Sequence, residues 1–171
     1  MQERIDITPR GVSGCLLLRP MPGGAFWPDL DEGLALLRTL DRVVVLVPDE
    51  ELAIHSRAYW RWLRDDVDDA PTIVRFPIVD WGLPTEADAF FACARDVQAA
   101  LARGERVLVH CWAGVGRSGT FAMAVLVEHG YSLDQAEPLV RAAGGSPEGR
   151  QYEWVRAEAV RRHAHARRDG G

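Results

Sequence analysis

Short apolar runs that alternate with one-faced helical patterns constrain the fold of this chain more than any other feature. Four runs predict buried strands, because each is short, rich in apolar residues, and bounded by polar or turn-forming residues. They cover residues 13–19, 42–47, 72–76 and 105–109. Strands that alternate with helices favour a mainly parallel sheet with helices on both faces. We therefore predict an α/β fold with a central, mostly parallel sheet of four to five strands flanked by helices.

The helical patterns between and after these runs predict six helices. Pro28 stands where a first helical residue belongs, and a stripe of leucines follows it. Nearly every residue from Ser118 to His129 is apolar, which indicates a helix buried in the middle of the domain, and Gly130 ends it. The predicted ranges are 28–40, 49–63, 87–101, 118–129, 132–143 and 149–165.

Length and composition set the domain organisation. With 171 residues, 47% of them apolar, the chain can bury one sizeable core and is too short for two ordinary domains. We expect a single domain over residues 1–171, with its core at 13–165. Because no run of about 18 apolar residues occurs and the N-terminus lacks a secretory signal pattern, we expect a cytoplasmic protein that does not engage membranes.

Charge and cysteine content exclude several classes of partner and ligand. The formal net charge of −5 gives no broad positive surface for nucleic acid or anionic lipid. The three cysteines, Cys15, Cys93 and Cys111, are odd in number and irregularly spaced, so they support neither a disulfide framework nor a zinc site. We expect free thiols, no metal, no cofactor and no nucleic-acid partner, and we also expect a monomer.

One strand-to-helix connection carries the residues of an oxyanion site. Residues 109–120 read VHCWAGVGRSGT and join the last apolar run to the buried helix. Gly114 and Gly116 let the backbone curl, so that successive amide N–H groups point into one concavity. The helix that we expect to start at Ser118 adds its own free N–H groups and its positive dipole end. This stretch therefore predicts a cradle for an anion such as phosphate.

The same stretch places a thiol and a guanidinium beside the cradle. A bound phosphoryl group would lie beside Cys111, and Arg117 can return a planar guanidinium to two of its oxygens. Positive surroundings favour the thiolate, and thiolate attack on phosphorus gives a phosphocysteine that divides one slow hydrolysis into two easier displacements. Ser118 is placed to hydrogen-bond the departing sulfur, and His110 to orient the loop and help hold the thiolate.

A leaving alkoxide or phenolate needs a proton, so the site also requires a carboxylic acid on a neighbouring loop. Residues 76–85, FPIVDWGLPT, supply Asp80 just after the third apolar run, at the sheet edge where function gathers in such folds. Pro77 and Pro84 stiffen this loop, and Gly82 lets it bend. We expect Asp80 to protonate the leaving oxygen and then, as carboxylate, to activate water.

Each of these residues also has an ordinary structural interpretation. Buried cysteines, glycine-rich turns and strand-end histidines are common packing features, and aspartate is a common turn former. The whole His-Cys-x5-Arg-Ser string between a strand and a helix is far more specific than its parts. A Walker A loop is excluded because no lysine follows the glycine.

Together the two segments resemble the cysteine-dependent protein tyrosine and dual-specificity phosphatase superfamily. HCWAGVGRSGT is similar to its phosphate-binding signature, and PIVDWGLP to the acid loop of its small members. The sequence looks most like kinase-associated phosphatase and small prokaryotic tyrosine phosphatases, over residues 13–165. The resemblance implies a protein tyrosine phosphatase-like fold and a phosphoprotein or phosphopeptide substrate.

The resemblance also implies a role for each matching residue. Cys111 would be the nucleophile and Arg117 the clamp on the phosphate. Asp80 would be the general acid, Ser118 would assist thiolate departure, and His110 would support the loop. The amide groups that bind the substrate phosphate would come from Trp112, Ala113, Gly114, Val115 and Gly116, with Arg117 beside them.

The predicted function is hydrolysis of phosphotyrosine monoesters, with activity on phosphoserine and phosphothreonine left open. Trp112 and Val115 stand where lipid-directed relatives carry basic residues, so we expect little activity on phosphoinositides. Gln151 resembles a glutamine that positions hydrolytic water in some relatives, but an ordinary surface glutamine is the simpler interpretation, so Gln151 stays outside the catalytic set. Two alternatives remain open: a catalytically weak phosphopeptide-binding domain, and a rhodanese-like or arsenate-reductase-like cysteine enzyme.

Overall fold

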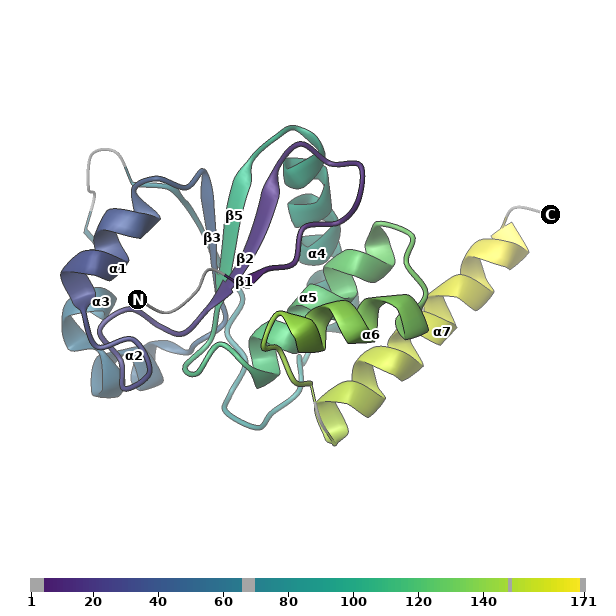
Figure 1. Ribbon diagram of the computed structural model, residues 1–171. Helices are drawn as coiled ribbons and strands as arrows, with labels where there is room; N and C mark the ends of the chain where they lie inside the picture. Colours follow the sequence, from purple (N-terminus) through teal and green to yellow (C-terminus); the bar gives the residue numbers. More distant parts are fainter. Residues whose placement is uncertain (1–4, 66–69, 148, 170–171) are drawn as a thin grey trace.

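A five-stranded sheet forms the centre of the computed structural model, which describes residues 5–65, 70–147 and 149–169 (Figure 1). In spatial order the strands are β1 (Ile5–Asp6), β2 (Cys15–Arg19), β5 (Arg106–His110), β3 (Arg42–Val45) and β4 (Thr72–Arg75). Strands β2, β5, β3 and β4 are parallel to one another, and β1 pairs antiparallel with β2. The predicted α/β class is confirmed. The sequence pattern missed β1 because two residues are too few to show a strand period.

Seven helices surround the sheet in the described part of the chain. They are α1 (Leu30–Leu37), α2 (Asp49–His55), α3 (Arg57–Trp62), α4 (Ala87–Ala102), α5 (Gly116–Glu128), α6 (Leu133–Ala142) and α7 (Arg150–Asp169). Figure 1 shows α1 to α3 on one side of the sheet and α4 to α7 on the other. None of these helices combines the length and the apolar character needed to cross a membrane.

The strand order shows where the sheet reverses direction. The chain steps outward from β2 to β3 to β4, and α4 then returns it to insert β5 between β2 and β3. Because crossovers between parallel strands are right-handed, the outward and return steps place their helices on opposite faces. Ligands of open α/β sheets bind beyond the carboxyl ends of the strands at such a reversal. The end of β5 is therefore the expected place for a site.

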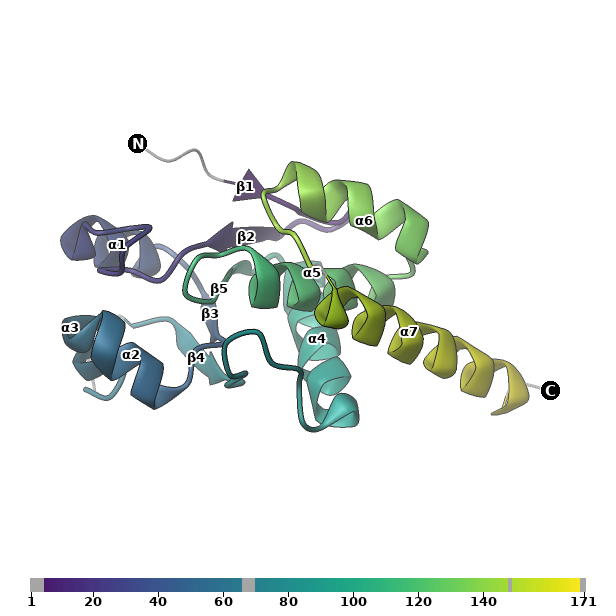
Figure 2. The same cartoon turned by 90° about the horizontal axis from the view of Figure 1, so that it is seen from below.

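The register aligns the ends of the parallel strands. His110 of β5 is opposite Arg19 of β2 and Val45 of β3, and Val45 is opposite Arg75 of β4. The loops that follow β4 and β5 consequently leave the sheet from the same edge. In both Figure 1 and Figure 2 these two loops and the start of α7 lie side by side.

Helix α5 passes through the core, as its sequence predicts. Every residue from Arg117 to Val127 is buried. The helix packs against α4, α6, α7 and the strands β2 and β5. Burial on all sides fixes the position of the helix, and with it the loop that precedes it. It begins at Gly116 rather than at the expected Ser118, which places Arg117 in its first turn.

Two other differences from the predicted helices have a local cause. The single helix expected over 49–63 is two helices, because the backbone leaves the helical conformation at Ser56, where φ is −155° and ψ is 73°. Helix α1 begins at Leu30 rather than at Pro28, because the Asp29 side chain accepts a hydrogen bond from a backbone N–H in the first turn and caps the helix.

Candidate active site

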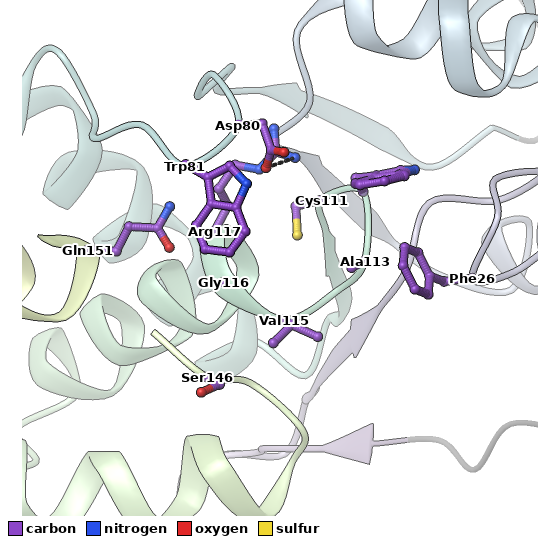
Figure 3. Close-up of a pocket in the computed structure, with 11 residues that line it drawn as sticks. Phe26, Asp80, Trp81, Cys111, Ala113, Val115, Gly116, Arg117, Ser146 and Gln151 are labelled. Carbon is purple, nitrogen blue, oxygen red and sulfur yellow. Dashed lines mark ion pairs between the residues drawn. The ribbon is translucent and has the colours of Figure 1, made fainter. Parts of the chain in front are cut away.

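A cavity of about 370 Å³ opens beyond the ends of β4 and β5 (Figure 3). It is lined by Phe26, Asp80, Trp81, Cys111, Trp112, Ala113, Val115, Gly116, Arg117, Ser146 and Gln151. The sulfur of Cys111 points into this ring of residues in Figure 3, although only 3% of the residue is exposed. The structure thus brings the predicted thiol, guanidinium and carboxylate to one cavity, and Gly114, Ser118 and His110 lie outside its lining.

Two carbonyl groups of the loop after β5 accept hydrogen bonds from backbone N–H groups of other segments. The Trp112 carbonyl accepts a hydrogen bond from the Met21 N–H at 3.1 Å, and the Val115 carbonyl accepts one from the Ser146 N–H at 3.1 Å. In a trans peptide, the N–H of the next residue points opposite to the carbonyl. The amides of Ala113 and Gly116 are therefore directed inward, where an anion can accept their hydrogen bonds.

The two glycines of the loop are needed for different reasons. Gly114 has a φ of +75°, and a Cβ there would lie 2.6 Å from the carbonyl carbon of Arg19, so both conformation and space require glycine. Gly116 was expected to help the loop curl, but it is the first residue of α5. A Cβ on Gly116 would lie 2.9 Å from Gln151 Oε1, so the end of the Gln151 side chain packs directly against this glycine.

The Arg117 side chain is only 3% exposed, and hydrogen bonds hold its guanidinium in place. Its Nη1 donates to both carboxylate oxygens of Glu51, at 2.7 and 3.0 Å, and to the Ile78 carbonyl at 2.8 Å. Its Nη2 lies 3.1 Å from Asp80 Oδ1. Nη1 is thus fixed by α2 and by the loop that carries Asp80. Nη2 is the nitrogen next to the Asp80 carboxylate, which lines the cavity.

His110 supports the loop through a buried relay. Its Nδ1 lies 3.3 Å from the Cys111 carbonyl oxygen, which can only accept, so Nδ1 carries the proton. Its Nε2 lies 2.8 Å from the hydroxyl of Tyr59 on α3 and therefore accepts a hydrogen bond from it. Burial lowers the pKa of His110 to about 3, so the imidazole is neutral, and burial raises the pKa of Tyr59.

Asp80 lies on an exposed turn that is closed by a hydrogen bond from the Gly82 N–H to the Val79 carbonyl, at 2.9 Å. Trp81, at the third position of this turn, has a φ of +56° and is 85% exposed. This left-handed conformation costs a residue with a side chain about 1–2 kcal/mol. The acid is thus presented on a strained tip beside the buried thiol.

The side chains of Ser118 and Trp112 have different surroundings. The Ser118 hydroxyl is fully buried, and no group in the described residues bonds to it. The Trp112 ring stacks on His55, with centroids 4.8 Å apart, and meets the edge of Phe26, at 5.3 Å. Trp112 therefore packs against neighbouring rings and lines the cavity at the same time.

Gln151 is not the surface residue that its sequence context suggested. It is 8% exposed, and its Nε2 donates to the Gly82 carbonyl at 3.0 Å. Sequence reasoning also missed Glu51 and Tyr59, the partners of Arg117 and His110. A buried arginine demands a carboxylate partner, but the spacing of the chain's 25 acidic residues does not identify which one.

Comparisons with known proteins identify a family and solved structures that this chain resembles. A family model described as a DSP-PTPase phosphatase of polymorphic toxin systems matches residues 43–131, just over half of the chain. Among solved structures, Tk-PTP in its active form is 29% identical, with a TM-score of 0.67 and 91% of this chain and 97% of that chain covered. No curated protein sequence matches.

Two further structures share the fold. Kinase associated phosphatase, with a serine in place of its catalytic-site cysteine, is 20% identical, with a TM-score of 0.71 and 85% of each chain covered. PTPMT1 in complex with PI(5)P is 22% identical, with a TM-score of 0.66 and 96% and 97% of the two chains covered.

The fold and these similarities define a phosphatase of the cysteine-dependent dual-specificity and tyrosine phosphatase superfamily. The chain belongs to the DSP-PTPase phosphatase family of polymorphic toxin systems.

Proposed function

We propose that the chain hydrolyses phosphotyrosine monoesters of proteins, and phosphoserine and phosphothreonine monoesters more slowly, through a phosphocysteine intermediate. The observation that carries this proposal is the convergence of Cys111, Arg117 and Asp80 on one cavity. The distance of 3.1 Å between Arg117 Nη2 and Asp80 Oδ1 supports their proposed roles as phosphate clamp and general acid.

In the first step, the Cys111 thiolate gives an electron pair to phosphorus and the bond from phosphorus to the leaving oxygen breaks. Asp80 transfers its proton to that oxygen, so the products are a phenol or alcohol and phosphocysteine. In the second step, the Asp80 carboxylate takes a proton from water, the water oxygen attacks phosphorus, and the thiolate departs. The otherwise unbonded Ser118 hydroxyl can then donate to the sulfur, and Asp80 is protonated again.

The charge of the phosphoryl group is met by groups that are already in place. Arg117, the inward amides of the loop and the positive end of α5 all act on the transferring oxygens. Because Glu51 and the Ile78 carbonyl hold the guanidinium beforehand, little reorganisation is needed when substrate binds. Phosphate would compete with Asp80 for Nη2, which would free the acid to face the leaving oxygen.

The lining of the cavity favours aromatic phosphomonoesters. Phe26, Trp81 and Trp112 supply apolar surface for a phenyl ring. Arg117 is the only lysine or arginine among the lining residues that the structure describes, so the further phosphates of an inositol head group would stay unpaired. We also propose that the protein acts as a monomer in the cytoplasm and needs no metal or cofactor.

The proposal is tested by assaying an aryl phosphate in the presence of EDTA and by trapping phosphate on the peptide that contains Cys111. A comparison of kcat/KM for a phosphotyrosine peptide, a phosphothreonine peptide and a soluble phosphoinositide then ranks the substrates. We expect the phosphotyrosine peptide first and the phosphoinositide last. The opposite ranking overturns the substrate assignment, and phosphopeptide binding without turnover would instead favour a binding domain. Thiosulfate or arsenate activity would favour the other cysteine enzymes.

A further inference from the structure

Residues 143–147, which follow α6, and the first turn of α7 form a third wall of the cavity. Ser146 and Gln151 are its members in the lining. Gln151 touches both loops of the site. Its Nε2 donates to the Gly82 carbonyl of the acid loop (residues 76–85) at 3.0 Å, and its Oε1 lies against Gly116 near the end of the phosphate loop (residues 110–117). Figure 3 shows the Gln151 side chain reaching from α7 toward the cavity.

This wall is fastened to the phosphate loop by backbone contacts. The Ser146 N–H donates to the Val115 carbonyl at 3.1 Å. A Cβ on Gly119 of α5 would lie 3.0 Å from the Ser146 nitrogen and 3.0 Å from Pro147 Cδ, so the two backbones meet with no room for a side chain. Helix α7, which carries Gln151, also packs against α5, the helix that follows the phosphate loop.

The acid loop, by contrast, depends on outside contacts. Asp80 and Trp81 occupy the middle of the turn that Gly82 closes, and the left-handed conformation of Trp81 favours opening of that turn. The hydrogen bond from Gln151 reaches the turn at Gly82, only two residues from the carboxyl group. It is thus placed to hold the turn closed and to set the direction of Asp80.

We infer that Gln151 is a positioning residue for the general acid, which it aligns with the leaving oxygen through the Gly82 carbonyl. This inference rests on the proposed function. It differs from a role in positioning hydrolytic water, because alignment of Asp80 changes the step that forms phosphocysteine as well as its breakdown, whereas water alignment changes the breakdown alone. The two roles therefore change different sets of rate constants.

The test uses Gln151→Glu, which keeps the shape but removes the N–H donor, and Gln151→Met, which removes it without adding charge. The matched control is Gln98→Glu on α4, because Gln98 bonds His129 outside the cavity.

For a phosphotyrosine peptide, whose leaving group has a pKa of about 10, both Gln151 variants should lower kcat/KM by about 10- to 100-fold. For p-nitrophenyl phosphate the loss should stay below about 3-fold, because its leaving group needs little protonation. Gln98→Glu should match the unaltered protein on both substrates.

A double-mutant cycle adds a readout that a purely structural role would not move. In an Asp80→Asn background, either Gln151 substitution should cause almost no further loss on the phosphotyrosine peptide, because the group that Gln151 aligns is gone. Equal losses on both substrates, or additive losses in the cycle, would overturn the inference. The inference would also be overturned if a Gln151 substitution lowered kcat and left kcat/KM unchanged, because that pattern indicates water positioning. The proposed function fails separately, if Cys111→Ser retains turnover in the otherwise unaltered chain.

Discussion

The two loops that meet at the cavity are built in opposite ways. The two ends of the phosphate loop are buried, and partners on α2 and α3 hold Arg117 and His110 there, respectively. The acid loop is exposed, and its tip carries a strained Trp81. In the proposed mechanism, the groups that stabilise charge throughout the reaction are thus fixed in the core, whereas the group that meets first a leaving oxygen and then water lies at the surface.

The largest expected effect comes from breaking the fixed loop at its nucleophile. Cys111→Ser should lower kcat by about 10⁴-fold or more, because serine without an adjacent base is a poor nucleophile. The variant should keep its fold and its affinity for phosphate, since the loop amides and Arg117 are unchanged. Turnover and isothermal titration with inorganic phosphate measure both properties, and substantial residual turnover would rule out the thiolate mechanism.

The clamp offers a test of how much the fixed geometry is worth. Arg117→Lys should lower kcat/KM by about 10³-fold, because one ammonium cannot reproduce the planar fork that contacts Glu51, the Ile78 carbonyl and the phosphate together. The loss should be the same for leaving groups of high and low pKa, since the clamp acts on the equatorial oxygens. A loss confined to poor leaving groups would contradict this role.

The acid loop should respond in the opposite way. Asp80→Asn should lower kcat/KM by about 100-fold for a phosphotyrosine peptide, the usual worth of general acid catalysis, and far less for p-nitrophenyl phosphate. The measurement is the slope of log(kcat/KM) against the leaving-group pKa across a series of aryl phosphates. If Asp80→Asn leaves this slope unchanged, the proton comes from another group.

The same contrast explains what the sequence could predict. The phosphate loop is one continuous string at the junction of a strand and a helix, so the sequence predicted both its residues and its position in an α/β sheet. The residues that support the loop could not be predicted in this way. Glu51 and Arg117 are 66 residues apart, and Tyr59 and His110 are 51 apart, so no local spacing connects them.

The third wall was missed for a related reason. The start of α7 was predicted nearly correctly, at 149 against the observed Arg150. Which face of that helix meets the acid loop depends on the close packing of the α6–α7 connection against Gly119, which is a tertiary contact. A polar glutamine among charged residues therefore looked like a surface position. Sequence periodicity identifies the element but not the neighbour that an isolated polar side chain will meet.

The buried support of the phosphate loop should also make stability depend on pH. The pKa of His110 is lowered by burial to about 3, against about 6.5 for an unperturbed histidine. As the pH falls below about 6.5, the unfolded chain binds a proton that the folded chain does not, so stability is lost progressively down to about pH 3.

At pH 5 this loss amounts to about 2 kcal/mol relative to pH 7.5. Urea unfolding at the two pH values measures it. His110→Gln should remove this part of the pH dependence. It should also lower stability at neutral pH, because the buried Tyr59 hydroxyl loses the imidazole Nε2 as its hydrogen-bond acceptor. An identical pH dependence in the variant and the unaltered chain would show that His110 is not the titrating group.

The smallest expected effect concerns the strained tip of the acid loop. Asparagine tolerates the left-handed conformation that Trp81 adopts, so Trp81→Asn should stabilise the fold by about 1 kcal/mol and raise Tm by about 2–4 °C. The same variant should lose about 3- to 10-fold in kcat/KM on a phosphotyrosine peptide, because it removes apolar surface that would meet the ring. It should lose little on a phosphothreonine peptide, whose side chain has no ring to cover.

Val79→Asn is the matched control, since Val79 is also exposed on this turn but does not have a positive φ. It should give no rise in Tm, because it relieves no backbone strain. If the two variants change Tm equally, strain at Trp81 is not what separates the acid loop from the phosphate loop. If Trp81→Asn raises Tm and leaves the preference for phosphotyrosine intact, the indole does not contribute to substrate choice. A rise in Tm together with a loss of that preference would indicate that the exposed loop gives up stability to hold an aromatic side chain where the substrate ring enters.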